Sequence, residues 1–385
     1  MIISNIEYRE DNGVVSVVAR ITADKGRFSR DVYVQSDNAN LLSAEPSAFL
    51  LAAYLPAWAM GEREIIVEGD ICPVLLANFK VSASILRHWF SDFGVAPHVT
   101  SGVARRVPAD GAAVFMSAGV DSMHTLFELT EHLPFGHSDR PTGGVLLDYR
   151  GMSLGDDEAL RRFDERRERC KFLLGSRGLE FDWIRTNIRS LKPEGKFWTR
   201  RYHGAVLAAM AHFCSNKYGR FYISSSIAVN TMSGPPISYP WGSHPMLDPF
   251  YSSGHMQIKH YGTETAKADK IRELGSWVEG LKHLHVCVSK TDSASNCGRC
   301  KKCIKTKMYL AAHGINEAFV AFKDPRLTAK NVADIKINAE WLYRTYSVLG
   351  DRLEALDPTS KFLAPLKQSL STYKKRKWIY KLFGK

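Results

Sequence analysis

Hydrophobic positions in the N-terminal part of the chain follow two different patterns. Some segments are apolar at every second residue, which is typical of half-buried strands, and others are apolar over longer stretches with helical spacing. The expected elements are strands at 14–23, 28–34 and 64–67 and helices at 46–60 and 72–93. Together they predict a small α+β domain over residues 1–108, and residues 99–108 look like a linker.

From Gly111 onward, short apolar runs alternate with amphipathic segments. Alternation of this kind predicts an α/β domain with a doubly wound parallel sheet, whose ligands bind beyond the carboxyl ends of the strands. We place this domain at residues 109–310. The expected strands are 112–116, 144–148, 181–186 and 220–223, and the expected helices are 121–132, 160–174, 202–214 and 265–274.

The remaining residues, 311–385, predict a helical C-terminal extension. Its best helical patterns lie at 332–349 and 362–370. It ends in a basic tail, 374–385, in which six of twelve residues are Lys or Arg. We expect this tail to be a solvated terminal helix with one apolar side packed on the protein, although such a pattern also suits an anionic surface.

Composition adds a broad class and a sign of charge. The 385 residues are 45% hydrophobic and 24% charged, as in globular proteins. No signal peptide and no span of roughly 20 apolar residues stands out, so a cytoplasmic protein without a membrane partner is the default expectation. The formal charge of +12 favours an anionic partner, and nucleotide phosphates, nucleic acid and a membrane surface would all fit.

A short loop stands where the expected strand at 112–116 runs into the helix at 121–132. Two hydroxyl donors, a glycine that lets the backbone approach an anion, and the free N–H groups of the helix suit this loop to pyrophosphate. Asp121 suggests a role towards Mg²⁺ or in holding the loop shape. An ordinary strand–turn–helix of small residues is the alternative interpretation. The loop reads Ser117-Ala118-Gly119-Val120-Asp121-Ser122.

Four of the seven cysteines lie close together in the sequence, in the pattern C-x9-C-x2-C-x2-C. Such spacings let four thiolates face one ion and close a tetrahedral structural zinc site with no open position. An iron–sulfur cluster is the competing metal, and reduced cysteines or a redox pair are the interpretation without metal. The expected ligands are Cys287, Cys297, Cys300 and Cys303.

The loop resembles the SGGxDS motif of the PP-loop ATP pyrophosphatases, a superfamily that splits ATP between the α and β phosphates and transfers AMP to a substrate oxygen. The resemblance implies bound ATP and Mg²⁺. It makes Ser117, Asp121 and Ser122 the catalytic residues and the whole loop part of the nucleotide site. Ala118 departs from the motif by replacing its first glycine, and a left-handed conformation there would cost about 1–2 kcal/mol.

The loop and the cysteines together resemble the 7-cyano-7-deazaguanine synthases of queuosine biosynthesis, over about residues 111–310. That family adenylates a carboxylate, forms an amide with ammonia, and then adenylates and dehydrates the amide to a nitrile. The resemblance implies a carbon–nitrogen ligase whose substrate is a small molecule or a protein with a carboxylate or amide. Ile2 replaces the N-terminal cysteine of glutaminases, so the nitrogen would come from free ammonia or an amine.

Further candidate residues follow the other expected strands or open the helix at 202–214. Each has an ordinary alternative as a helix cap, a core residue or a solvated turn residue. The clusters are 200–204, 224–226, 239–249 and 260–264, and the residues expected to contact the nucleotide are Asp148, Arg201, His203 and Ser225.

Three other functions remain open. The basic charge allows a tRNA-thiolating enzyme, but a closed four-thiolate site leaves no obvious sulfur carrier, so nucleic acid is not the favoured partner. Relatives of the synthase in anti-phage operons suggest an enzyme of antiviral defence that modifies a protein or peptide. A degenerate, non-enzymatic scaffold is suggested by Ala118. The oligomeric state is also open, a homodimer included.

Overall fold

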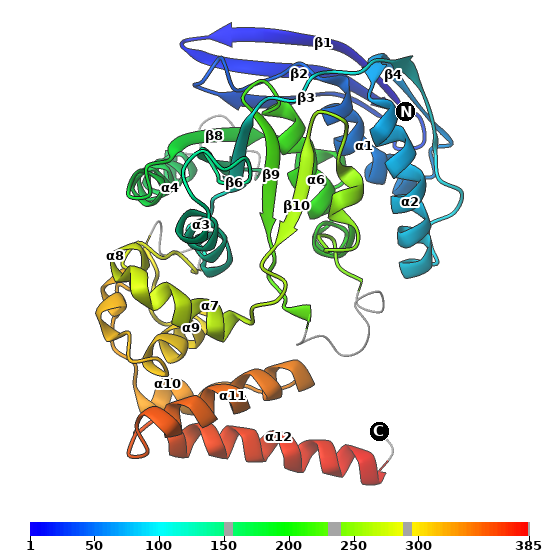
Figure 1. Ribbon diagram of the computed structural model, residues 1–385. Helices are drawn as coiled ribbons and strands as arrows, with labels where there is room; N and C mark the ends of the chain where they lie inside the picture. The colour runs from blue at the N-terminus through cyan, green and yellow to red at the C-terminus, as the bar shows by residue number, and fades with distance from the viewer. Residues whose placement is uncertain (150–156, 230–239, 288–294, 384–385) are drawn as a thin grey trace. The chain divides into compact units, whose positions relative to one another are not determined.

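The computed structural model describes residues 1–149, 157–229, 240–287 and 295–383 (Figure 1). The chain divides into two compact units. The first consists of Met1–Ser117 and Thr125–Glu264, and the second of Ala118–His124 and Thr265–Lys385. The boundaries expected near residues 108 and 310 remain predictions.

A ten-stranded sheet forms the first unit, in the order β10-β9-β6-β7-β8-β3-β2-β1-β4-β5. The class predicted from the sequence, α/β, is confirmed. The strands are β1 (Ile2–Asp11), β2 (Val14–Ala23), β3 (Phe28–Ser36), β4 (Glu64–Ile71), β5 (His98–Val103), β6 (Gly111–Phe115), β7 (Gly143–Asp148), β8 (Glu180–Thr186), β9 (Tyr218–Ser224) and β10 (Gln257–Tyr261).

Strand directions divide this sheet into three parts. The strands from β10 to β8 are all parallel, the ladder from β8 through β3 and β2 to β1 is antiparallel, and β1, β4 and β5 are again parallel. The pairing of Val34 with Thr186 joins β3 to β8. The N-terminal strands therefore extend the same sheet that carries the loop after β6.

Helices cover both faces of the parallel part. On one face, Val145 and Leu147 of β7 belong to the core shared with α1 (Pro46–Met60) and α6 (His203–Phe213). On the other face, α4 (Asp157–Gly175) packs on β7 and β8. Its Leu174 lies so close that a Cβ on Gly144 would come within 2.5 Å of it.

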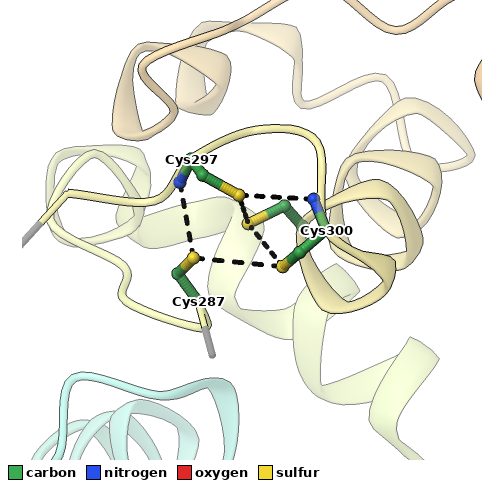
Figure 2. Close-up of side chains that lie close together, drawn as sticks. Cys287, Cys297 and Cys300 are labelled. Carbon is green, nitrogen blue, oxygen red and sulfur yellow. Dashed lines mark hydrogen bonds between the residues drawn. The ribbon is translucent and has the colours of Figure 1, made fainter. Parts of the chain in front are cut away.

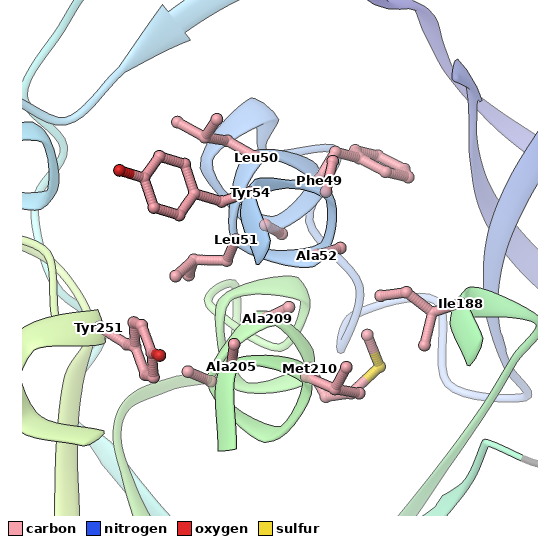
Figure 3. Close-up of a cluster of buried hydrophobic side chains, with 14 of the residues drawn as sticks. Phe49, Leu50, Leu51, Ala52, Tyr54, Ile188, Ala205, Ala209, Met210 and Tyr251 are labelled. Carbon is pink, nitrogen blue, oxygen red and sulfur yellow. The ribbon is translucent and has the colours of Figure 1, made fainter. Parts of the chain in front are cut away.

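The helix α1 is buried on nearly every side, which explains its continuous apolar sequence. Pro46 opens it, and Gly61, in the left-handed conformation at φ 80°, ends it. Figure 3 shows its apolar side chains against those of α6, with Leu51 and Ala209 among the labelled residues. Small residues on α6 let the two helices approach closely.

The second unit is helical in the residues described. Its longest pair, α11 and α12, is joined by the stacked rings of Tyr343 and Tyr373, 5.3 Å apart, and by the ion pair of Glu340 with Lys377 at 2.7 Å. Its α-helices after residue 264 are α7 (Lys267–Glu273), α8 (Val278–Leu281), α9 (Lys301–Ala311), α10 (Ala329–Ala333), α11 (Glu340–Leu356) and α12 (Leu363–Phe383). No helix in the described ranges is long and apolar enough to cross a membrane.

Several expected elements were wrong in extent. The supposed linker at 99–108 overlaps β5, an edge strand with little apolar sequence, and β1 and β10 were missed. The helix expected at 332–349 is two helices, because α10 ends at Ala333 and α11 begins at Glu340. The helix expected at 362–370 continues to Phe383, and Trp378 and Ile379 on it are exposed.

We predict that Leu51→Ala lowers the free energy of unfolding by about 2–5 kcal/mol, because the α1–α6 contact leaves a cavity when a buried leucine is truncated. Leu51 is 1% exposed. Leu356→Ala, at a helix position that is 54% exposed, is the matched control and should change stability by less than about 0.5 kcal/mol. Urea unfolding followed by circular dichroism measures both, and equal effects would contradict the assigned packing.

Candidate functional site

The loop predicted to bind phosphate joins β6 to α3 (Val120–His132). Ala118 has φ 57°, the left-handed region that normally favours glycine. Its carbonyl oxygen accepts a hydrogen bond of 2.7 Å from the backbone N–H of His285. That bond helps to hold the peptide in this orientation. Ala118 therefore adopts the left-handed conformation whose cost the sequence analysis gave.

Gly119 immediately precedes α3. Its carbonyl oxygen accepts hydrogen bonds from the hydroxyl of Ser122, at 3.1 Å, and from the N–H of Met123, at 2.9 Å. The first N–H groups of an α-helix have no partner within the helix, and they carry its positive dipole end. The start of α3 therefore has the properties that an anion needs.

Lysine side chains surround Asp121 within the second unit. Lys267 Nζ lies 2.6 Å from Asp121 Oδ2, and Lys270 Nζ lies 3.6 Å from Oδ1. The two lysines are three positions apart on α7 and so share one face. Burial, followed by the charges of Lys267 and Lys302, lowers the pKa of Lys305 to about 8, while Asp121 opposes this shift. Three lysines, Lys267, Lys270 and Lys305, thus lie near the carboxylate of Asp121.

A buried contact fixes α3 to α7 beside these lysines. His124 Nε2 lies 2.7 Å from Glu273 Oε2, and the His124 side chain is fully buried. Because His124 is three positions after Asp121, this contact sets the position of the first turn of α3 relative to Lys267 and Lys270. The lysines are thereby held near the loop rather than left to extend into solvent.

In the first unit, Ser117, Asp148 and Ser225 follow or end three neighbouring strands. Because β6, β7 and β9 are parallel neighbours, their carboxyl ends meet at one edge of the sheet. Asp148 is buried and lies 3.5 Å from Arg185 Nε. The hydroxyl of Ser225 donates to the carbonyl of Ile227 at 2.7 Å. Both side chains therefore have local partners.

A cavity of about 160 Å³ opens beyond β9 and β10. Residues from the clusters singled out in the sequence line this cavity, although Tyr239 lies outside the described residues. Burial lowers the pKa of His203, which favours its neutral form. The lining includes His203, Ser224, Ser225, Ser226, Trp241, His244 and His260.

The cavity contains a histidine–aspartate pair. His260 Nδ1 lies 2.8 Å from Oδ2 of Asp248, which also accepts from the Ser243 hydroxyl at 2.6 Å. The other oxygen, Oδ1, accepts from the N–H of His244 at 3.1 Å. A carboxylate only accepts hydrogen bonds, so Nδ1 of His260 is the donor in this pair, and Asp248 fixes the orientation of the ring. The pair has the geometry of an oriented general base.

Arg201 is held elsewhere. Its guanidinium makes two hydrogen bonds to the Asp92 carboxylate, at 2.8 and 2.7 Å, and lies 4.4 Å from the centre of the Phe90 ring. The hydrogen bonds from Arg201 hold the pKa of Asp92 below its usual range. The expected nucleotide contact of Arg201 would require this ion pair to open.

The four cysteines come together in the second unit, and Figure 2 shows the sulfurs of the three labelled ones turned towards each other. The sulfur–sulfur distances are 3.9 Å for Cys287–Cys300, 3.9 Å for Cys297–Cys303 and 3.5 Å for Cys300–Cys303. A tetrahedron with Zn–S bonds of ~2.3 Å has sulfurs about 3.8 Å apart, whereas a disulfide needs ~2.05 Å. The cluster could therefore hold a zinc ion.

Backbone geometry around the cysteines supports the same conclusion. Gly298 has φ 77°, and a Cβ there would lie 2.2 Å from the carbonyl oxygen of Asp324, so only glycine fits. The side chain of Asn296 accepts from the N–H groups of Val286 and Cys287, at 2.8 and 3.0 Å. Cys303 lies in the first turn of α9, where burial raises the pKa of its thiol. A bound cation would offset that cost.

Two parts of these sites were missed from the sequence. The pair Asp248–His260 joins two expected clusters, but no spacing in the sequence indicates that they meet. Lys267 and Lys270 open an expected helix at i and i+3, and this spacing was the available signal.

Comparisons with family models, with curated proteins and with solved structures found no match to this chain.

We predict that glycine substitution has opposite effects at two buried alanines. Ala118→Gly relieves about 1–2 kcal/mol of left-handed strain and loses ~0.8 kcal/mol for one methyl group, so stability should stay level or rise by up to about 1 kcal/mol. Ala209→Gly, inside α6, should lose about 2 kcal/mol through helix propensity and the same methyl group. Chemical unfolding compares them, and an equal loss in both would contradict strain at Ala118.

The cysteine cluster should bind one zinc equivalent that survives gel filtration. We expect Cys300→Ser to lose this equivalent and to lower the melting temperature, because structural zinc binding is coupled to folding. Cys170→Ser, at a buried cysteine outside the cluster, should keep the zinc. Elemental analysis measures the metal, and bound iron in place of zinc would contradict the assignment.

Proposed function

We propose that this chain is an ATP-dependent adenylating enzyme of the PP-loop kind, which forms AMP and pyrophosphate. The observation that carries the proposal is the loop between β6 and α3, where a left-handed residue at 118 precedes a helix start with lysines beside it. A residue in a strained conformation is kept when the local shape has a use. This use would be to turn backbone N–H groups towards the phosphates.

The charges near the loop suit a pyrophosphate leaving group. Lys267, Lys270 and Lys305 would offset the negative charge that develops when the bond between the α and β phosphates breaks. Asp121 accepts from Lys267, which supports its role in holding the loop and the lysines together. A bound Mg²⁺ would add further charge neutralisation on the phosphate oxygens.

The acceptor step that we propose is acyl transfer. A substrate carboxylate oxygen attacks the α phosphorus and displaces pyrophosphate, which gives an acyl adenylate. Ammonia or an amine then attacks the acyl carbon, loses a proton and releases AMP.

Of the acceptor classes, we favour a deazaguanine-like carboxylate, by resemblance to the 7-cyano-7-deazaguanine synthases. The cavity of about 160 Å³, with Trp241 and neutral His203 in its wall, supports a small, flat substrate. The closed four-thiolate cluster would then be structural, since it leaves no position for substrate. A protein terminus or a tRNA base remains the alternative acceptor.

The test is the bond that is broken in ATP. We expect purified protein with ATP, Mg²⁺, ammonium and a 7-carboxy-7-deazaguanine acceptor to release AMP and pyrophosphate, measured by chromatography of labelled ATP. Ser122→Ala should lower kcat about 10²-fold or more, because it removes a hydroxyl from the start of α3. Asp121→Asn should also lower kcat, because it removes the charge that holds Lys267 in position beside the loop.

Asp351→Asn, at an exposed aspartate on α11, is the matched control and should keep full activity. Release of ADP and phosphate, or unchanged rates in both loop variants, would contradict the adenylation mechanism. Activity only with a peptide or with tRNA in place of the deazaguanine would retain adenylation and change the acceptor.

A further inference from the structure

Three side chains from distant parts of the first unit meet in its interior. Glu45 precedes α1, His212 lies in the last turn of α6, and His255 lies just before β10. All three are buried, and one ligand atom from each lies within 4.8 Å of the others. None of them has a role in the adenylation site described above.

Two atoms of this group face each other without a hydrogen-bond partner among the described residues. They are Oε1 of Glu45 and Nδ1 of His212, which are 3.7 Å apart. That separation is too long for a hydrogen bond. His212 Nε2 lies 3.1 Å from the carbonyl oxygen of Tyr251, to which it donates, so Nδ1 is the ring nitrogen that faces Glu45. A proton on Nδ1 would satisfy these two buried atoms as an ion pair, and a metal cation bound to both would satisfy them as ligands.

The outer contacts of the group are those that orient metal ligands. His255 Nε2 lies 2.7 Å from Glu45 Oε2, and its Nδ1 lies 3.2 Å from the hydroxyl of Ser253. The hydroxyl of Ser215 donates to Glu45 Oε2 at 3.2 Å. Histidine ligands of metals usually have their second nitrogen hydrogen-bonded, to a backbone carbonyl, a carboxylate or water. The Tyr251 carbonyl meets this condition for His212, and the Ser253 hydroxyl fills the same position for His255.

A cation could reach the group from solvent. A cavity of about 290 Å³ is lined by Glu45 and His255 together with Glu68, Asp70, Cys72 and Arg106. Three carboxylates against one guanidinium give this cavity a negative balance, which raises the local concentration of cations.

We propose that Glu45, His212 and His255 form a second metal site, which binds a divalent transition-metal ion, zinc in particular. Two imidazoles and one carboxylate are a zinc ligand set, with bonds of ~2.0–2.2 Å. Ligand atoms on one such ion lie at most about 4.3 Å apart, and the 3.7 Å between Oε1 and Nδ1 is within this limit. Binding would move His255 away from its present hydrogen bond to Glu45.

This site differs from the cysteine cluster in its chemistry. Three protein ligands leave at least one coordination position open, and a water molecule from the cavity would fill it. Nitrogen and oxygen ligands also bind zinc less exclusively than four thiolates, so the second ion should exchange more readily. The proposal does not depend on adenylation.

The test is a zinc titration of the full chain, with the cysteine site already filled and a chromophoric chelator as competitor. Wild-type protein should bind one further equivalent, and Glu45→Gln and His255→Gln should bind none. His98→Gln, at an exposed histidine outside the cavity, is the matched control and should keep it. Circular dichroism checks that each variant is folded.

Cobalt added to the zinc-filled wild-type protein provides a second measurement that needs no variant. We expect weak visible bands without the intense sulfur-to-cobalt absorption of a thiolate site. If wild-type protein binds no further zinc and shows no such bands, the three residues form a hydrogen-bonded network only and the proposal is wrong. Retention of the equivalent by Glu45→Gln would also overturn it.

Discussion

Parallel pairing of β6 with β7 and β9 is the constraint on which the candidate chemistry depends. The strand β7 is buried along its whole length, so it needs a strand on either side and helices on both faces. Each of these strands is connected to the next by a segment that contains a helix. Such a connection returns the chain to the same end of the sheet, so the next strand runs parallel to the last. Ser117, Asp148 and Ser225 consequently reach one edge of the sheet although about a hundred residues separate the first from the last.

In the loop after β6, Ala118 adopts a left-handed backbone conformation that lowers the stability of the fold. A left-handed alanine costs about 1–2 kcal/mol, and glycine would remove that cost. The conformation is held from outside the loop, by the hydrogen bond from His285, and the following helix turn is anchored by His124 and Glu273. Neighbours that fix a backbone in this way allow a strained residue to persist, which is the usual situation at a binding loop.

Elements with strong periodicity were predictable from the sequence, and contacts across the fold were not. The buried helix Pro46–Met60 and the strand at β7 follow from their apolar runs, because burial on all sides leaves few alternatives. The strand His98–Val103 was missed because an edge strand exposes most of its side chains and loses the alternation. The cysteine cluster was predictable because its ligands are close in sequence. The pairs Asp248–His260 and Glu45–His255 depend on tertiary packing, which spacing does not encode.

Local charge, rather than the net charge of +12, decides which ions each part of the protein can attract. The start of α3 has three lysines near one aspartate, and it therefore suits phosphate. The cavity beside Glu45 has the opposite balance, and the buried side chains of Glu45 and His212 suit a metal cation. Because the interaction of exposed charges is screened within about 8–10 Å, surface charges elsewhere have little influence on either place. A basic protein can thus carry an anion site and a cation site without conflict.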